Sequence, residues 1–142
     1  MSKVAHVIWF GKKQFVGIDS TRHAVVMSAQ DDENGTGMSP AQLLLVALGG
    51  CTAYDVVNIL EKKKQHLTGL EITVTGEQET EPPWPYRRIH VHYLVRGREL
   101  QEKAVREAIE LSEQKYCSVA ATLRGSAEIT YDYTVVDEDQ QG

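Results

Sequence analysis

A long apolar run constrains this chain more than any other feature. The segment Leu43–Leu60 spans 18 residues and contains a single charged side chain, Asp55. A strong helix start precedes it, because Ser39 suits the N-cap, Pro40 suits the first helical position, and Gln42 lies at the capping-box spacing from Ser39. The sequence therefore predicts one long apolar helix.

This helix is expected to span residues 39–66, and apolar side chains cover nearly its whole circumference. A helix that lies on one sheet needs an apolar stripe of only about 100°. A chain of 142 residues, about one domain, has little else to cover the opposite side. We therefore expect an obligate homodimer with this helix near the two-fold axis, where Gly49 and Gly50 let two backbones approach. A membrane span is disfavoured because polar groups interrupt the run and would need partners in lipid.

The rest of the chain indicates an α+β fold in a single domain, with antiparallel sheets around the long buried central helix. Alternating apolar residues predict strands on both sides of the helix, and a helical period after residue 100 predicts a second, amphipathic helix with Glu113 on its solvent face. The expected order is N-terminal strands and a loop over residues 1–38, the helix over 39–66, a strand-strand-helix-strand unit over 70–136, and a frayed tail over 137–142.

Composition excludes several functional classes. The formal charge of −5 and the scattered Lys and Arg residues offer no basic stripe, so no nucleic-acid partner is expected. Two cysteines are too few for a secreted disulfide scaffold, and the polar first residues do not resemble a signal peptide. We expect a cytoplasmic protein with no membrane partner.

The two cysteines, Cys51 and Cys117, are the candidate chemical groups. Either could be only a small buried hydrophobe. A zinc site is disfavoured because neither has a second cysteine or a histidine at ligand spacing, and His90 and His92 share the polar face of a predicted strand. No metal and no cofactor are therefore expected, a structural disulfide is disfavoured in a reducing compartment, and thiol chemistry remains.

The positions of the two cysteines in their predicted helices do not indicate which thiol is the reactive one. Cys51 lies in the middle of its helix, where the dipole offers little, and Asp55 one turn later would raise a thiol pKa. We expect Cys51, Asp55, Asn58 and Lys62 to form a polar stripe that lines a pocket. Cys117 stands at the start of a possible short helix, whose free N–H groups favour an anion. From these residues, either thiol could be the nucleophile.

Three segments carry a resemblance to a known family: Ser39–Leu45, Gly49–Cys51 and Cys117–Val119. With the element order, they resemble the OsmC/Ohr family of thiol-dependent hydroperoxide reductases, and serine after the second cysteine resembles a less characterised branch. The resemblance implies an intertwined dimer with two equivalent interface sites. It also implies that Cys51 is the peroxidatic thiolate for organic hydroperoxides, and that Cys117 resolves it as a disulfide that an external dithiol reduces.

Two positions depart from the family pattern. Gln42 replaces a glutamate, and residues 31–38 contain no arginine, which leaves Arg22 as the candidate stand-in for the cation that holds the thiolate. Gln42 also has a purely structural explanation in helix capping. The leading hypothesis is a cytosolic cysteine-based peroxidase. The alternatives are a dimeric redox sensor or small-ligand binder without efficient turnover, and a structural dimer whose cysteines only pack.

Overall fold

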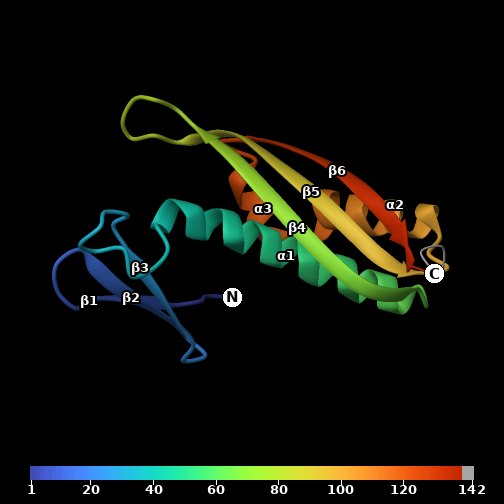
Figure 1. Ribbon diagram of the computed structural model, residues 1–142, viewed down its shortest axis with the longest axis horizontal. Helices are drawn as coiled ribbons and strands as arrows, with labels where there is room; N and C mark the ends of the chain where they lie inside the picture. The colour runs from blue at the N-terminus through green and yellow to red at the C-terminus, as the bar shows by residue number, and fades with distance from the viewer. Residues whose placement is uncertain (139–142) are drawn as a thin grey trace. The chain divides into compact units, whose positions relative to one another are not determined.

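The computed structural model describes residues 1–138 and shows a mixed α+β architecture (Figure 1). The chain divides into two compact units, residues 1–44 and residues 45–142. Each unit is described separately below. Of the predicted frayed tail, Asp137 is instead the last residue of a strand, and residues 139–142 lie outside the described part.

The first unit contains a three-stranded antiparallel meander, which confirms the predicted N-terminal strands. Its strands are β1 (Ala5–Trp9), β2 (Gln14–Asp19) and β3 (Ala24–Ser28), in the order β1-β2-β3. All of β1 is exposed within one chain, including Val7 at 63% and Trp9 at 65%. Large apolar side chains on a small sheet thus remain uncovered.

Helix α1 (Pro40–Lys62) begins where the sequence predicts. The Ser39 hydroxyl oxygen accepts a hydrogen bond from the Gln42 backbone N–H at 3.2 Å, which confirms Ser39 as the N-cap. The first turn belongs to the first unit and the remainder to the second.

The end of α1 differs from the prediction, because the helix stops at Lys62 and β4 (His66–Gln78) has already begun at His66. Lys64 adopts a left-handed conformation with φ of 61°, and the Gln65 N–H donates to the Leu60 carbonyl at 3.0 Å. This 6→1 bond is typical of a Schellman motif. The expected boundary at residue 66 was wrong because Lys64 takes the left-handed position that ends the helix.

Within one chain, α1 is only partly covered. Its buried residues, Leu48, Gly49, Thr52, Val56 and Leu60, form one stripe. On other faces Val46 is 53% exposed and Tyr54 is 71% exposed. The predicted all-round burial is therefore not achieved by a single chain. By length and composition alone α1 could cross a membrane, but the core helix of a soluble protein meets the same criterion.

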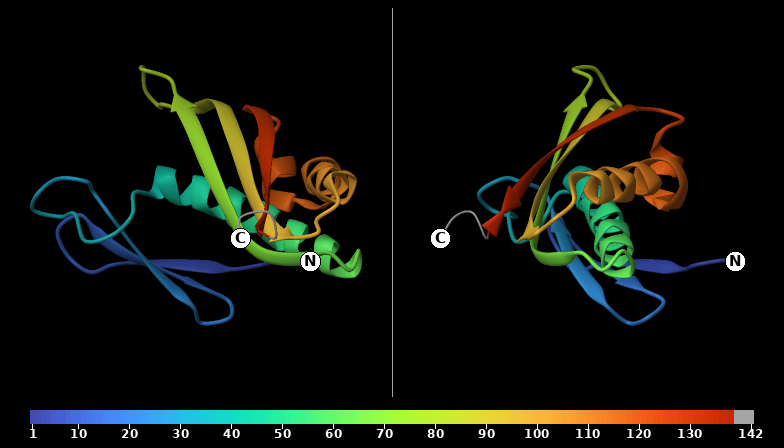
Figure 2. Two further views of the ribbon diagram at one scale, coloured as in Figure 1. Left: turned by 45° about the vertical axis from the view of Figure 1, so that its right-hand side comes forward. Right: turned by 90° about the vertical axis from the view of Figure 1, so that its right-hand side faces the viewer.

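The second unit holds a sheet of β4, β5 (Tyr86–Arg98) and β6 (Glu128–Asp137), in that order. The β4–β5 pair is antiparallel, but β5 and β6 are parallel, so the expectation of purely antiparallel sheets was wrong. Between β5 and β6 the chain runs through helices on the same face of the sheet that α1 covers (Figure 2). Such a crossover returns the chain to the end where β5 began, which makes the pairing parallel.

The two glycines of α1 have different surroundings. A Cβ atom on Gly49 would lie 3.2 Å from Val74 Cγ2 of β4, so this glycine allows close packing of the helix on the sheet. A Cβ atom on Gly50 would have no neighbour within 4 Å in the chain. The close approach at Gly49 is therefore to the chain's own sheet.

The helical crossover contains α2 (Glu102–Leu111), a π-helical turn η1 (Ser112–Tyr116) and α3 (Ser118–Leu123). In the π turn the Cys117 N–H donates to the Ser112 carbonyl, five residues back, at 2.9 Å. The wider turn changes the phase of the side chains that follow α2. Glu113 is consequently buried, at 2% exposure, and its predicted solvent-facing position was wrong.

Candidate functional site

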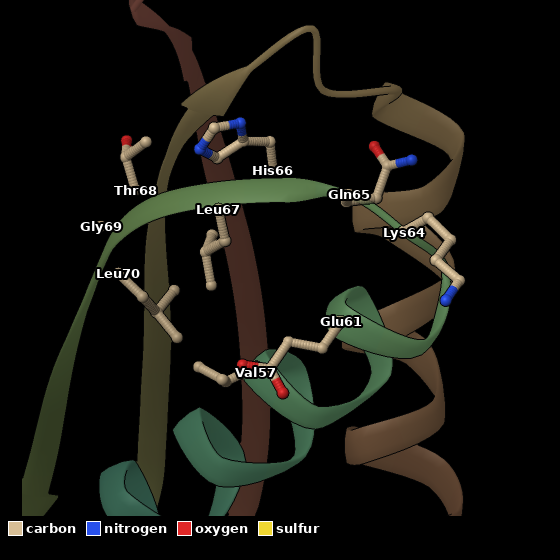
Figure 3. Close-up of a pocket in the computed structure, with 9 residues that line it drawn as sticks. All are labelled: Val57, Glu61, Lys64, Gln65, His66, Leu67, Thr68, Gly69 and Leu70. Carbon is tan, nitrogen blue, oxygen red and sulfur yellow. The ribbon is translucent and has the colours of Figure 1, made fainter.

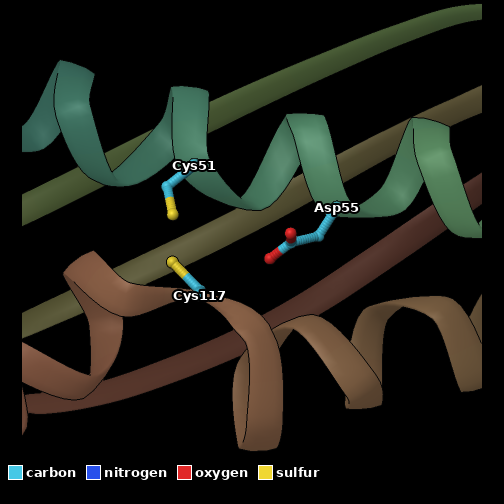
Figure 4. Close-up of side chains that lie close together, drawn as sticks. All are labelled: Cys51, Asp55 and Cys117. Carbon is cyan, nitrogen blue, oxygen red and sulfur yellow. The ribbon is translucent and has the colours of Figure 1, made fainter. Parts of the chain in front are cut away.

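Cys51 and Cys117 lie side by side in the second unit. Cys51 projects from the middle of α1, Cys117 precedes α3, and their sulfur atoms point toward one another (Figure 4). Both are free thiols, and the two sulfur atoms lie within 4.8 Å. The tertiary structure therefore brings together two thiols that are distant in the sequence, in a space where a disulfide needs little rearrangement.

The two thiols differ in accessibility, and the more buried one has a raised pKa. Cys117 is 3% exposed, whereas Cys51 is half-buried. As expected, Cys117 caps a short helix: its sulfur accepts a hydrogen bond from the Ala120 N–H at 3.3 Å. Burial raises the pKa of Cys117 to about 12, and a hydrogen bond with Cys51 adds to the rise, while the Ala120 N–H acts in the opposite direction. Cys51 is thus the thiol that an incoming molecule can reach.

This raised pKa predicts a pH-dependent stability. The folded protein holds the proton on Cys117 more tightly than the unfolded chain does. The protonated thiol therefore makes its full contribution to the free energy of unfolding below the ordinary thiol pKa near 9, and this contribution is lost as pH rises toward about 12. We compare the unfolding free energy of the reduced wild type minus that of Cys117→Ser. This value should stay constant from about pH 7 to 9 and should fall by about pH 10.5, because the wild type loses stability that the variant never had. Urea unfolding of both proteins measures it. A difference that grows with pH would contradict the assignment.

Asp55 is the third member of the cluster. One of its carboxylate oxygens lies within the same 4.8 Å of both sulfur atoms. It follows Cys51 by one helical turn, and its Oδ2 accepts a hydrogen bond from the Ser112 hydroxyl at 2.9 Å. The π turn supplies this hydroxyl and so orients the carboxylate beside the thiols.

A groove of about 500 Å³ opens beside this cluster. Three of the four residues of the predicted polar stripe, Asp55, Asn58 and Lys62, line it, but Cys51 does not. Its other walls include Tyr54, Ile59, Leu111 and Tyr116. The groove therefore offers apolar and aromatic surface next to a carboxylate that lies within 4.8 Å of both sulfur atoms.

A larger hollow of about 710 Å³ lies between the last turns of α1 and the start of β4 (Figure 3). It is lined by residues such as Val57, Glu61 and His66, and by neither cysteine. We therefore place the candidate site at the thiol cluster rather than in this hollow.

Sequence reasoning missed a buried polar network behind Cys117. The Glu113 carboxylate accepts hydrogen bonds from the Tyr93 hydroxyl at 2.5 Å and from the Arg124 guanidinium at 3.1 Å. Burial, followed by the bond to Glu113, raises the pKa of Tyr93. The signal for this network was the phase change at the π turn, which a regular helical period does not reveal.

Two predicted supporting residues belong to the first unit. Arg22 is exposed in the β2–β3 turn with a left-handed φ of 68°, and its N–H donates to the Asp19 carbonyl at 3.2 Å. Gln42 is exposed in the first turn of α1 and takes part in capping through its backbone. Roles for these two residues in holding a thiolate stay predictions.

His90 and His92 lie on the outward face of β5, as predicted. Asp132 on β6 lies between them: its Oδ1 is 2.8 Å from His90 Nε2 and 2.7 Å from His92 Nδ1. The hydrogen bond with His92, followed by the one with His90, lowers the pKa of Asp132. The three side chains are each at least 36% exposed, so this is a solvated surface cluster.

Comparison with known proteins identifies the family of this chain. Residues 31–132 match the OsmC family, described as OsmC-like protein. Protein YhfA of Escherichia coli K12 is 38% identical over 132 residues, which cover 93% of this chain and 97% of YhfA.

Solved structures share the fold. An OsmC-like protein from Mycoplasma pneumoniae superposes with a TM-score of 0.83 at 20% identity, over 96% of this chain and 98% of that one. An organic hydroperoxide resistance protein, OsmC, from Legionella pneumophila superposes with a TM-score of 0.66 at 12% identity, over 95% and 98%. The chain belongs to the OsmC-like protein family.

Proposed function

We propose that this protein is a thiol-dependent peroxidase that reduces organic hydroperoxides, with Cys51 as the peroxidatic and Cys117 as the resolving residue. The observation that carries this proposal is the facing pair of free thiols within 4.8 Å, one half-buried and one buried. The name of the Legionella relative, an organic hydroperoxide resistance protein, supports the same substrate class.

The reaction has three balanced steps. The Cys51 thiolate attacks the O–O bond, becomes a sulfenic acid, and releases an alkoxide that leaves as the alcohol after protonation. The Cys117 sulfur then displaces hydroxide from the sulfenic sulfur, which forms the disulfide and, with the thiol proton, one water molecule. An external dithiol reduces the disulfide and is itself oxidised to a disulfide.

Asp55 is suited to carry the proton in the second step. Cys117 must lose a proton when it attacks, and the departing hydroxide must gain one. The Asp55 carboxylate lies beside both sulfur atoms and is oriented by Ser112, so it can accept the first proton and return it to the hydroxide. This role explains why a carboxylate lies next to Cys117, although its negative charge contributes to the raised pKa of that thiol.

The groove beside Asp55 supports an organic rather than an inorganic peroxide. Aromatic and aliphatic side chains, including Tyr54 and Leu111, form part of its walls. Apolar surface binds an alkyl or aryl group but adds little affinity for hydrogen peroxide. Discrimination between the two oxidants is therefore expected in kcat/KM.

A thiol titration tests the proposal. One equivalent of cumene hydroperoxide added to the reduced, metal-free protein should consume both thiols rapidly and yield an intramolecular disulfide. In Cys117→Ser, the same addition should stop at a sulfenic acid on Cys51 that dimedone traps. Slow, unselective loss of thiols in the wild type would reject the proposal.

We also propose a homodimer. Apolar side chains exposed on β1 and on α1, such as Trp9 and Val46, are the supporting observation. A soluble monomer rarely leaves this much apolar surface uncovered, and a second copy would cover it by symmetry. The dimer and a cytoplasmic location remain parts of this proposal.

If the exposed side of α1 that carries Val46 is a dimer interface, a charge placed there should change the oligomeric state. We expect Val46→Glu to reduce the mass in solution from that of a dimer to about the 15.9 kDa of one chain, or to abolish soluble expression. Light scattering during gel filtration at micromolar concentration measures it. Thr73→Glu, on an exposed position of β4, is the control and should stay dimeric. A monomeric wild type would contradict the proposal.

One observation favours a second candidate, a redox-responsive protein with slow turnover. The Asp55 carboxylate lies within 4.8 Å of both sulfur atoms, and its negative charge disfavours a nearby thiolate. Such a protein would form the same disulfide over minutes, without repeated cycles in the presence of a dithiol. Steady-state turnover separates the two candidates.

A further inference from the structure

The cluster of Cys51, Cys117 and Asp55 also has the composition of a metal site. One donor atom from each side chain lies within 4.8 Å of the other two. Around a tetrahedral zinc ion, donors at about 2.0–2.3 Å from the metal are about 3.5–3.8 Å from one another. A small contraction from the 4.8 Å limit brings the three donors to that spacing.

We propose that the reduced protein binds one Zn²⁺ ion per chain through Cys51 Sγ, Cys117 Sγ and an Asp55 carboxylate oxygen. Binding displaces the two thiol protons to solvent, and no electron is transferred. Thiolate sulfur and carboxylate oxygen are both established zinc ligands, and three protein ligands leave a fourth position for water or an external thiol.

The surroundings of Asp55 support this assignment. The Ser112 hydroxyl donates to Asp55 Oδ2 at 2.9 Å, which orients the carboxylate and leaves its other oxygen to bind an ion. Hydrogen bonds of this kind, from outside the ligand set, orient metal ligands in many sites. The sequence indicated no zinc site because its ligands come from α1 and from the start of α3, not from a local motif.

Zinc binding would block the reactivity of the two sulfur atoms that the proposed peroxidase uses. A bound ion engages both thiolates, so neither can attack a peroxide or the other sulfur, and a disulfide in turn cannot bind the ion. Zinc binding requires only the three donors and is independent of the proposed peroxidase activity.

Metal titration of the full-length, reduced protein tests the inference. We expect one Zn²⁺ per chain in competition with a chromogenic chelator, and thiolate-to-metal charge-transfer absorption when Co²⁺ replaces Zn²⁺. Cys51→Ser and Cys117→Ser should each weaken Zn²⁺ binding at least about 100-fold, because even the loss of an outer partner costs 10–100-fold. Asp55→Asn should weaken it at least about 10-fold.

The surface cluster on β5 and β6 provides the control. A His90→Ala/His92→Ala double variant removes a second group of potential ligands, on the outward face of the sheet, and should leave Zn²⁺ affinity unchanged. Loss of binding in this variant with retention in Cys51→Ser would overturn the inference. So would Zn²⁺ binding that survives alkylation of both thiols in the wild type, a measurement that needs no variant to fold.

The outcomes separate the two proposals. Turnover of hydroperoxide by metal-free protein that binds no Zn²⁺ would reject the metal site alone. Tight Zn²⁺ binding by protein whose metal-free, reduced form does not react with hydroperoxide would reject the peroxidase alone.

Discussion

Replacing Cys51 with serine should lower the rate of hydroperoxide reduction at least about 10³-fold, since the variant lacks the nucleophile on which every later step depends. Cys51 is the more accessible of the two thiols, and serine preserves its size on α1. Stopped-flow consumption of cumene hydroperoxide, with a dithiol reductant present and zinc removed by a chelator, measures the effect.

Cys117→Ser is the matched control for this experiment. It should retain a fast first reaction at Cys51 and lose repeated turnover, because no partner thiol remains to form the disulfide. The serine hydroxyl can still accept the hydrogen bond from the Ala120 N–H that caps α3. Equal first-reaction rates in wild type and Cys51→Ser would show that Cys51 is not the peroxidatic residue.

Replacing Arg124 with methionine should destabilise the fold by about 3 kcal/mol, at the lower end of the cost of breaking a buried ion pair. The Glu113 side chain is fully buried and would keep its hydrogen bond from Tyr93 but lose its cationic partner. We place the effect at the lower end because the Arg124 side chain is 39% exposed and is already partly hydrated. Urea unfolding under reducing conditions measures it.

A surface pair of the same chemistry is the control. Arg106 and Glu102 are joined at 3.0 Å on α2, with side chains 45% and 56% exposed. Arg106→Met should change stability by no more than about 0.5 kcal/mol. In a double-mutant cycle, Glu113→Gln should recover part of the loss in Arg124→Met, because it removes the unpaired charge. Equal effects of the two arginine substitutions would contradict a structural role for the buried network.

Local signals determined much of this protein from sequence alone. Ser39 and Pro40 predicted the start of α1, alternation predicted the strands, and the segment that follows Cys117 indicated a possible short helix. Each of these features depends on residues close together in the chain, so capping chemistry and periodicity are sufficient to predict them.

Only the tertiary structure decided which distant groups meet. The parallel β5–β6 pairing results from a helical crossover, and the π turn within it directs Glu113 inward and Ser112 toward Asp55. The hydrogen bond that orients Asp55 in the thiol cluster therefore depends on a single irregular turn. Sequence periodicity could not place these groups, because one additional residue in a turn changes which side chains face the core.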